Sequence, residues 1–150
     1  MFGAVAAGLR ITFANTAYTA GELAHQYTDS QASTIFIHPA LVPVALKMLE
    51  GLGVDAEEAR KRMVVMSWGE NVKHEPGFTQ LEELLGKGRL EEEEKFSGNQ
   101  VHETAYLCYS SGTTGKSKGV EVSPGLLCSW PSAHSRADDS TQCDFRTLDD

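Results

Sequence analysis

The sequence predicts an α/β fold in which a mainly parallel sheet is flanked by helices. Three observations support this prediction. Short apolar runs rich in β-branched residues alternate with amphipathic segments, the amphipathic segments carry helix-capping residues, and 150 residues suffice for one domain with a sizeable core. Strands that alternate with helices usually pair in parallel through right-handed crossovers. No internal repeat is evident.

The first part of the chain predicts a short strand and then a capped helix. Residues 11–13 form the apolar run of the strand, and the apolar residues 1–9 are interpreted as the start of a buried strand or helix. Thr19 precedes Glu22 by three positions, which is the spacing of a capping box. One face of the following helix is apolar, formed by Leu23, Ala24 and Tyr27.

Two further strand–helix units are expected in the middle of the chain. Residues 34–37 and 63–66 are short apolar runs typical of buried strands. Between them, residues 40–50 predict a helix, with Pro43 in its first turn and Gly51 at its end. A short helix capped by Asp55 and Glu58 follows and runs through Arg62. After the second strand, the sequence predicts a helix that ends at Gly86. Its apolar face is formed by Phe78, Leu81, Leu84 and Leu85.

The remaining segments between and after these elements are polar. Residues 86–98 predict a solvated loop that includes the acidic run 91–94. From Ser123 onward the chain has no sustained hydrophobic period, and we expect a disordered tail. Cys108 is expected to be a buried apolar residue on a strand. Tail residues with potential zinc ligands do not have zinc-site spacing, namely Cys128, His134 and Cys143.

The segment 109–120 is a polar, glycine-rich stretch between two apolar runs, 105–109 and 120–122. It reads YSSGTTGKSKGV and contains three glycines and two lysines. Glycines let several backbone N–H groups approach one anion, hydroxyl groups add donors, and lysine supplies a mobile positive charge. The pattern predicts a nucleotide-phosphate loop between two strands. The alternative, a plain hairpin turn, needs only one or two glycines.

A Walker A loop is a poorer description of the same segment. It requires glycine, four residues, and then Gly-Lys-Ser/Thr. Residues 115–117 supply the end of this pattern, but Ser110 stands at the place of its first glycine. Pro124 and Gly125 follow soon after and oppose the long helix that a P-loop should open.

The segment resembles instead the signature of the acyl-adenylate-forming superfamily, which includes acyl- and aryl-CoA ligases, luciferases and peptide-synthetase adenylation domains. That signature is Ser/Thr-Ser-Gly-Ser/Thr-Thr-Gly, two variable residues, and Lys-Gly. Residues 110–115 match it, as do Lys118 and Gly119, whereas Ser117 stands where the family usually has proline. Four upstream stretches resemble the region preceding the signature in 4-coumarate-CoA-ligase-like enzymes: 3–5, 14–19, 22–26 and 29–30.

The resemblance implies a domain organisation. Residues 1–123 are identified as a partial AMP-binding domain, an internal slice of the family's large domain, and residues 124–150 as a tail outside the family pattern. Pro124 stands where the family usually has a histidine. The family's downstream aromatic-Gly-x-Thr-Glu motif is absent, because the chain contains no Thr-Glu dipeptide. We therefore expect a fragment that is inactive alone.

The resemblance also implies the chemistry. The complete family uses Mg-ATP to convert a carboxylic acid into an acyl-adenylate, which a thiol, commonly that of CoA, then takes up. Lys118 would be the catalytic residue, with no metal ligand assigned in this chain. The ATP phosphates would be held by Ser110, Ser111, Gly112, Thr113, Thr114, Gly115 and Lys118. Two alternatives remain open at this stage: a non-catalytic interaction protein that keeps the α/β scaffold, and a small P-loop-like NTPase.

Composition excludes several other function classes. A net charge of −8 and a pI near 5.1 disfavour nucleic-acid binding, because phosphates would be repelled. No apolar stretch reaches the length of a membrane span, and the first residues lack the basic flank of a signal peptide. The three cysteines are widely spaced, and the chain has no peroxisomal C-terminal tripeptide, so we expect a cytoplasmic protein. For the full-length family, a peroxisomal location is also open.

Overall fold

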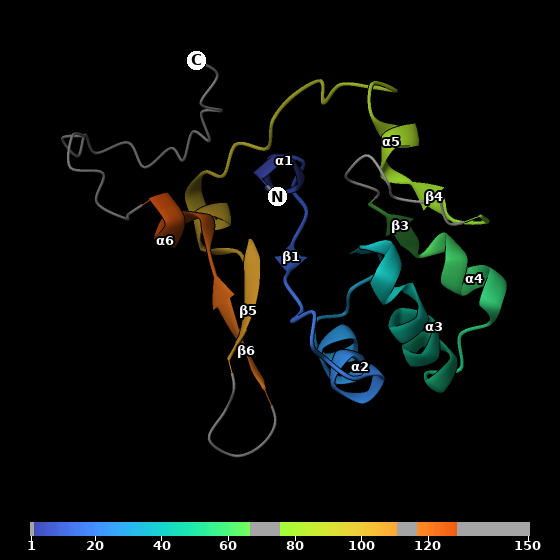
Figure 1. The fold of residues 1–150 in the computed structure, drawn as a ribbon. Coiled ribbons are helices and arrows are strands. Elements are labelled where there is room, and N and C mark those ends of the chain that lie inside the picture. Colours follow the sequence, from blue (N-terminus) through green and yellow to red (C-terminus); the bar gives the residue numbers. More distant parts are fainter. Residues whose placement is uncertain (1, 67–75, 111–116, 129–150) are drawn as a thin grey trace. The chain divides into compact units, whose positions relative to one another are not determined.

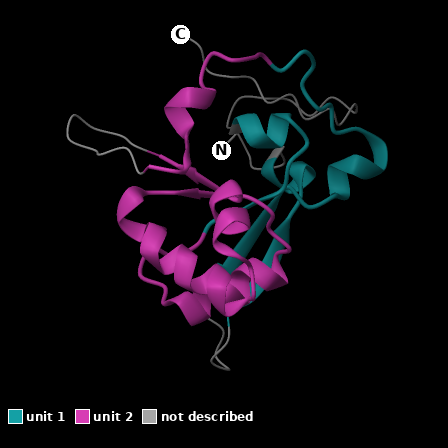
Figure 2. Ribbon diagram, turned by 90° about the vertical axis from the view of Figure 1, so that its right-hand side faces the viewer, with its two compact units in different colours: residues 1–13, 90–150 teal, residues 14–89 magenta. Residues whose placement is uncertain are grey.

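The computed structural model describes residues 2–66, 76–110 and 117–128 and shows an α/β fold (Figure 1). Its contacts divide the chain into two compact units (Figure 2). Unit 1 combines residues 1–13 with residues 90–150, and unit 2 consists of residues 14–89. No helix within the described ranges is long and apolar enough to cross a membrane.

Unit 2 is a three-stranded parallel sheet with accompanying helices. The sheet, called sheet B, has the strand order β2-β3-β4, and both pairings are parallel. Its elements in chain order are α2 (Ala20–Asp29), β2 (Ile35–Ile37), the 3₁₀ turn η1 (Pro39–Leu41), α3 (Val42–Gly51), α4 (Ala56–Lys61), β3 (Met63–Val65), β4 (Thr79–Gln80) and α5 (Leu81–Leu84). The predicted alternation of helices with parallel strands is confirmed from α2 to β3, whereas no helix is described between β3 and β4.

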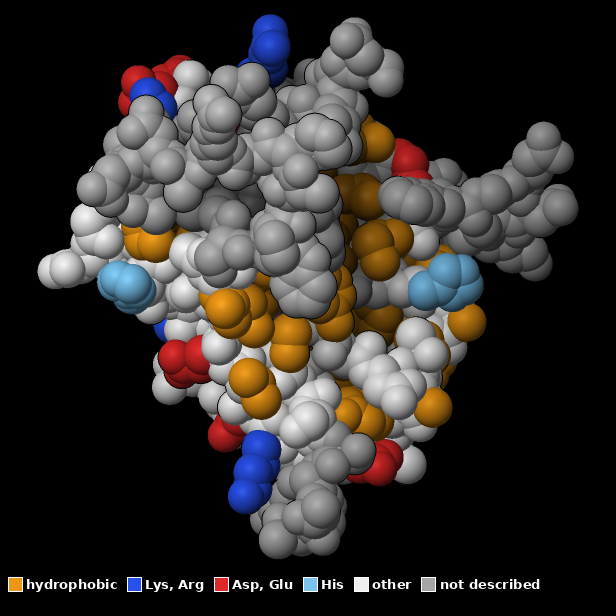
Figure 3. All heavy atoms as spheres, turned by 90° about the vertical axis from the view of Figure 1, so that its left-hand side faces the viewer, with side chains coloured by type: hydrophobic (Ala, Val, Ile, Leu, Met, Phe, Trp, Pro, Cys, Tyr) orange, Lys and Arg blue, Asp and Glu red, His pale blue; other side chains and the backbone are white. Residues whose placement is uncertain are grey.

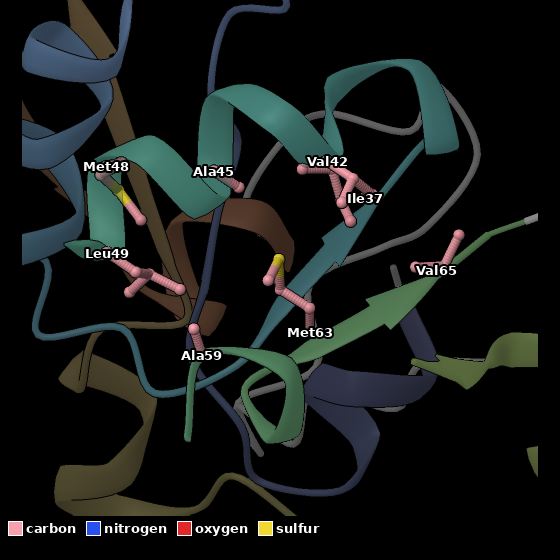
Figure 4. Packing of buried hydrophobic residues seen from close by; sticks show 8 residues of the cluster. All are labelled: Ile37, Val42, Ala45, Met48, Leu49, Ala59, Met63 and Val65. Atoms are coloured by element: carbon pink, nitrogen blue, oxygen red, sulfur yellow. The ribbon is translucent and has the colours of Figure 1, made fainter. Parts of the chain in front are cut away.

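One apolar cluster holds unit 2 together (Figure 4). It joins side chains from α3, α4 and sheet B, and the partly buried apolar face of α2 packs against it. Each buried Leu or Met side chain contributes roughly 1.5–3 kcal/mol to the free energy of folding. The buried members are Ile37, Val42, Ala45, Met48, Leu49, Ala59, Met63 and Val65.

The N-termini of α2 and α4 carry capping residues that the sequence indicated, except that the Glu58 carboxylate accepts from the Arg62 Nε and does not cap α4. Thr19 and Glu22 form the capping box of α2, in which the Glu22 carboxylate accepts from the Thr19 N–H at 2.8 Å. Asp55 caps α4, because its Oδ1 accepts from the N–H groups of Glu57 and Glu58, both at 3.0 Å. Pro43 lies in the first turn of α3, where backbone N–H groups have no acceptor within the helix, so the proline costs no hydrogen bond.

Unit 1 is built on a second sheet, called sheet A, with the order β1-β5-β6. β1 (Ile11–Thr12) pairs in parallel with β5 (Tyr106–Ser110), and β5 pairs antiparallel with β6 (Lys118–Val122). Its other elements are α1 (Phe2–Ala6), the 3₁₀ turn η2 (Gly98–His102) and α6 (Pro124–Cys128). The core of this unit is smaller and contains Val5, Phe96, Val101, Ala105 and Tyr106. Hydrophobic side chains also remain visible on the molecular surface (Figure 3).

Helix α6 begins with a buried proline and packs closely on η2. Pro124 is almost completely buried. A Cβ atom at Gly125 would lie 2.5 Å from the Val101 Cγ1, so a larger residue here would force Val101 or the backbone to shift. The first residues of the predicted tail are thus folded into unit 1, while residues 129–150 lie outside the described part of the chain.

Several sequence predictions need correction. The helical face expected from Phe78 to Leu85 is wrong in its first part, because Thr79 and Gln80 pair with β3 as strand β4. Only four residues of that segment are helical, and Leu85 is 67% exposed. Phe36 is 57% exposed although its strand was expected to be fully buried.

Two further differences concern the end of α3 and the sheet. α3 includes Gly51, and the glycine with a left-handed backbone lies two residues later, at Gly53 with φ of 77°. The described strands are divided between two sheets, whereas the sequence had led us to expect one. Three of the four strand pairings are nevertheless parallel, and the α/β class with a mainly parallel sheet is confirmed.

Candidate functional site

The candidate phosphate loop is carried by the β5–β6 hairpin. The sequence predicted strands over 105–109 and 120–122, and the observed strands extend further into the signature on both sides, to Ser110 and back to Lys118. Ser110 and Lys118 are direct partners and form the last described pair of the ladder. The two ends of the signature thus lie side by side, on adjacent strands that run antiparallel (Figure 1).

Ser110 and Lys118 also share one face of the hairpin. Directly opposed residues of an antiparallel pair point to the same side, with Cβ atoms about 4.5–5.5 Å apart. Both residues are exposed. A hydroxyl donor and an ammonium group therefore stand next to each other where the signature loop begins and ends, which is a suitable arrangement for holding phosphate oxygens.

The charge of Lys118 is not neutralised by the strand that carries it. Glu121 occupies an alternate position of β6 and therefore points to the other face. There its Oε2 accepts a hydrogen bond from the Thr104 hydroxyl at 2.9 Å. Within the described part of the chain, Lys118 forms no ion pair. Its ammonium group is available to an anion.

The inner end of the hairpin is anchored in the core of unit 1. Ile11 and Thr12 of β1 pair with Tyr106 and Leu107 of β5, and the Thr12 hydroxyl donates to the Leu107 carbonyl at 2.9 Å. The Tyr106 ring stacks on Phe13 with a centroid separation of 6.4 Å. The loop-bearing end consequently projects from a fixed base.

Of the predicted site residues, the structure describes only Ser110 and Lys118. Ser110 and Lys118 are brought together as described above. The other predicted phosphate-binding residues lie outside the described part of the chain: Ser111, Gly112, Thr113, Thr114 and Gly115. Cys108 was expected to be buried and is exposed, because the buried part of β5 ends near Tyr106. Among the described residues, no group of three or more His, Cys, Asp or Glu side chains could hold a metal ion.

Comparison with known proteins identifies the family. The family model described as AMP-binding enzyme matches residues 1–143, and these residues include the whole hairpin and its signature. The chain belongs to the AMP-binding enzyme family. Membership of this family implies the use of ATP.

Curated relatives agree with this assignment. The chain is 35% identical over 127 residues to 4-coumarate–CoA ligase-like 8 of Arabidopsis thaliana, which covers 80% of this chain and 20% of that protein. It is 33% identical over 113 residues to 4-coumarate–CoA ligase-like 3 of the same plant. This match covers 75% of this chain and 19% of that protein. This AMP-binding chain therefore spans about one-fifth of the length of the curated relatives it matches.

Two solved structures share its fold. The red-emitting luciferase of Phrixothrix hirtus is 21% identical, with a TM-score of 0.58 over 80% of this chain and 22% of the luciferase. The anthranilate–CoA ligase AuaEII, solved in complex with anthranoyl-AMP, is 20% identical, with a TM-score of 0.57 over 86% of this chain and 24% of the ligase. At these identities the likeness concerns the fold of the AMP-binding chain.

Proposed function

We propose that the β5–β6 hairpin binds the triphosphate of Mg-ATP as part of an acid-activating ligase of the acyl- or aryl-CoA type. The observation that carries this proposal is the cross-strand pair of Ser110 and Lys118 at the two ends of the signature. The curated relatives are 4-coumarate–CoA ligase-like proteins, and their names indicate the same reaction class. This chain is proposed to supply the phosphate-binding segment of that reaction.

The proposed chemistry is a two-step acyl transfer. An oxygen of a carboxylate attacks the α-phosphorus of ATP, the bond from that phosphorus to the β-phosphate oxygen breaks, and pyrophosphate leaves. The acyl-adenylate then passes its acyl group to a thiol, with AMP as the leaving group. Ser110 and the predicted loop hydroxyls and amides would hold the β- and γ-phosphates, and Lys118 would offset the negative charge that accumulates on the departing pyrophosphate.

The described face of the hairpin fits a metal that arrives with the nucleotide. Mg²⁺ in nucleotide sites is bound largely by phosphate oxygens and water, with one or two protein oxygens. The Ser110 hydroxyl can supply such an oxygen, whereas the Glu121 carboxylate is engaged on the opposite face. We therefore place Mg²⁺ with the substrate rather than in a carboxylate cage of this chain.

The hairpin geometry also bears on the alternative of a P-loop NTPase. In a P-loop, the phosphate-binding backbone leads directly into a helix whose N-terminus faces the anion. In this chain, strand β6 follows the loop, and the next helix, α6, has five residues and begins with Pro124. The geometry favours the adenylate-forming signature.

An NMR titration of the 150-residue chain with Mg-ATP tests the proposal. The amides of Ser110 and Lys118 should shift, with an affinity of about 1 mM, since ordering a glycine-rich loop costs roughly 1–2 kcal/mol per fixed residue. Lys118→Ala should weaken binding severalfold. Lys116→Ala is the matched control and should have the smaller effect, because only Lys118 matches the family lysine. Shifts confined to residues far from the hairpin, or equal effects of the two substitutions, would refute the assignment.

We further propose that this chain, assayed alone, forms no acyl-adenylate. Adenylation needs the acid and the nucleotide held in line, and the chain spans about one-fifth of its ligase-like relatives. Acid-dependent exchange of labelled pyrophosphate into ATP, measured across fatty and aromatic acids, should stay at background. Clear exchange with any acid would overturn this part of the proposal and leave the binding proposal intact.

A further inference from the structure

Gly119 lies beneath the ring of Tyr109 at the last ladder pair before Ser110 and Lys118. The two residues are direct cross-strand partners on β5 and β6. A Cβ atom placed on Gly119 would stand 3.1 Å from the Tyr109 Cζ, 3.3 Å from its hydroxyl oxygen and 3.5 Å from its Cε1. The outer half of the ring therefore covers the glycine backbone and spans both strands of the hairpin.

Space, and not backbone conformation, explains the glycine at this position. Five glycines of the described chain have a positive φ angle, and Gly119 is not one of them. Other residues could adopt its backbone conformation, and most would favour a strand more than glycine does. What glycine provides here is the absence of a side chain, so that an aromatic ring can lie across the pair.

This contact lies on the face of the hairpin opposite the candidate phosphate face. Side chains alternate along each strand, so Tyr109 and Gly119 point away from the side that carries Ser110 and Lys118. At this end β6 contributes no buried side chain, since its residues from Lys118 to Glu121 are exposed. A slip of the β5–β6 pairing by one residue would carry Lys118 to the wrong face.

We propose that Tyr109 is a positioning residue whose ring, seated on Gly119, fixes the strand register and so keeps Lys118 beside Ser110 on the phosphate-binding face. Aromatic residues that cover a cross-strand glycine are an established means of fixing register in sheets. The inference rests on the proposed function, because the benefit of a fixed Lys118 is its use on phosphate. It assigns a role to two residues that touch no substrate.

The first test changes the contact from both sides. Gly119→Val blocks the seat of the ring, and Tyr109→Thr removes the ring. Each should weaken Mg-ATP binding about fivefold, the factor expected for loss of a strong cross-strand pair. Tyr109→Phe keeps the ring and should bind like the unmodified chain. If glycine had no such role, Gly119→Val would leave binding unchanged or strengthen the hairpin, because valine favours strands.

Rescue and coupling separate positioning from general support of the fold. Tyr109→Thr should restore binding to the Gly119→Val chain, since no ring then competes with the valine. In a Lys118→Ala background, Tyr109→Thr should have almost no further effect, because its influence passes through the lysine. Additive effects in this background, or failure of the rescue, would overturn the inference.

The nucleotide-free chain provides a readout that does not depend on ATP. Nuclear Overhauser contacts between Ser110 and Lys118 should be lost in Gly119→Val, kept in Tyr109→Phe and restored in the double variant. If these contacts do not respond while the unmodified chain binds Mg-ATP through the hairpin, the positioning role is wrong and the proposed function stands. If the unmodified chain does not bind Mg-ATP at the hairpin, the proposed function is wrong. The positioning role is then wrong as well, even if the Ser110–Lys118 contacts change in the variants.

Discussion

Unit 2 and unit 1 of this chain differ in how much of each is buried. In unit 2 the central strand β3 is buried along its whole length, and eight buried side chains form one cluster. In unit 1 the strand β6 is exposed over four of its five residues, and the buried cluster contains five side chains. The AMP-binding signature lies in the less buried unit.

This contrast separates a well-packed region from the region that carries the proposed phosphate-binding hairpin. Unit 2 has well-capped helices, a continuous apolar cluster and parallel strands, which are features that stabilise a fold. Unit 1 has a hairpin whose base lies in its core and whose last described pair, Ser110 and Lys118, is exposed. Binding segments are often found on exposed connections carried by rigid elements, because polar backbone and side chains must stay accessible to the ligand.

Removing a buried leucine of unit 2 should have the largest effect. Leu49 is fully buried in the cluster of α3, and Leu49→Ala should lower the free energy of unfolding by about 3 kcal/mol, through lost apolar burial and the remaining cavity. Leu85→Ala is the matched control, since that side chain is 67% exposed, and it should change stability by less than about 0.5 kcal/mol. Urea unfolding followed by circular dichroism measures both. Equal losses would mean that unit 2 is not organised around its cluster.

Removing a tyrosine hydroxyl should stabilise unit 1 and destabilise unit 2. The Tyr106 hydroxyl in unit 1 is buried without a hydrogen-bond partner among the described residues, and burial raises the pKa of this hydroxyl. Tyr106→Phe should therefore raise the free energy of unfolding by up to about 1 kcal/mol. In unit 2, the Tyr27 hydroxyl accepts from the Arg62 Nη1 at 3.4 Å, and Tyr27→Phe should lower stability slightly. Thermal unfolding of both variants decides this, and a loss in Tyr106→Phe would contradict the assignment.

Acid should weaken the helix caps of unit 2, with the smallest of the three effects. Hydrogen bonds from the Thr19 backbone and hydroxyl lower the pKa of Glu22 below its ordinary 4.5. Bonds from the Glu58 and Glu57 amides lower the pKa of Asp55 below its ordinary 3.8. A lowered folded-state pKa means stabilisation that is fully present above the ordinary values and disappears as the pH falls through the folded-state values.

The matched variant for this test is Glu22→Gln with Asp55→Asn, which keeps capping groups and removes their titration. Its free energy of unfolding should fall less steeply between pH 5 and 2.5 than that of the unmodified chain, roughly the range in which carboxyl groups titrate. Parallel pH profiles for the two chains would show that these caps do not contribute to acid sensitivity.

Sequence reasoning predicted the elements whose causes are local. Thr19 and Asp55 cap their helices through groups two or three residues away, so a short window contains the whole interaction. The runs of β-branched residues in β2 and β3 likewise identify strands by composition alone. For the candidate site, the signature predicted the two strands that flank the loop. The pairing of Ser110 with Lys118 was not predicted and is seen only in the structure.

The remaining features depend on partners that are distant in sequence. Thr79 and Gln80 become a strand because β3 offers them a parallel partner, and this pairing overrides the helical spacing of Phe78, Leu81 and Leu84. Cys108 is exposed because the core of unit 1 ends at Tyr106, a boundary that no local pattern marks. The seat of Tyr109 on Gly119 follows from the register, which becomes visible only when the strands are paired.

The pairing of β1 with β5 has a consequence for how the chain folds during synthesis. Thr12 and Leu107, which are joined by a hydrogen bond, are 95 positions apart. The ribosome therefore completes all of unit 2 before the partner of β1 emerges. Chain synthesis proceeds at about 5–20 residues per second, and domains fold as units from the N-terminal side. Unit 2 can therefore fold several seconds before β1 can pair with β5. The segment with the AMP-binding signature is thus the last of the described sheet to assemble.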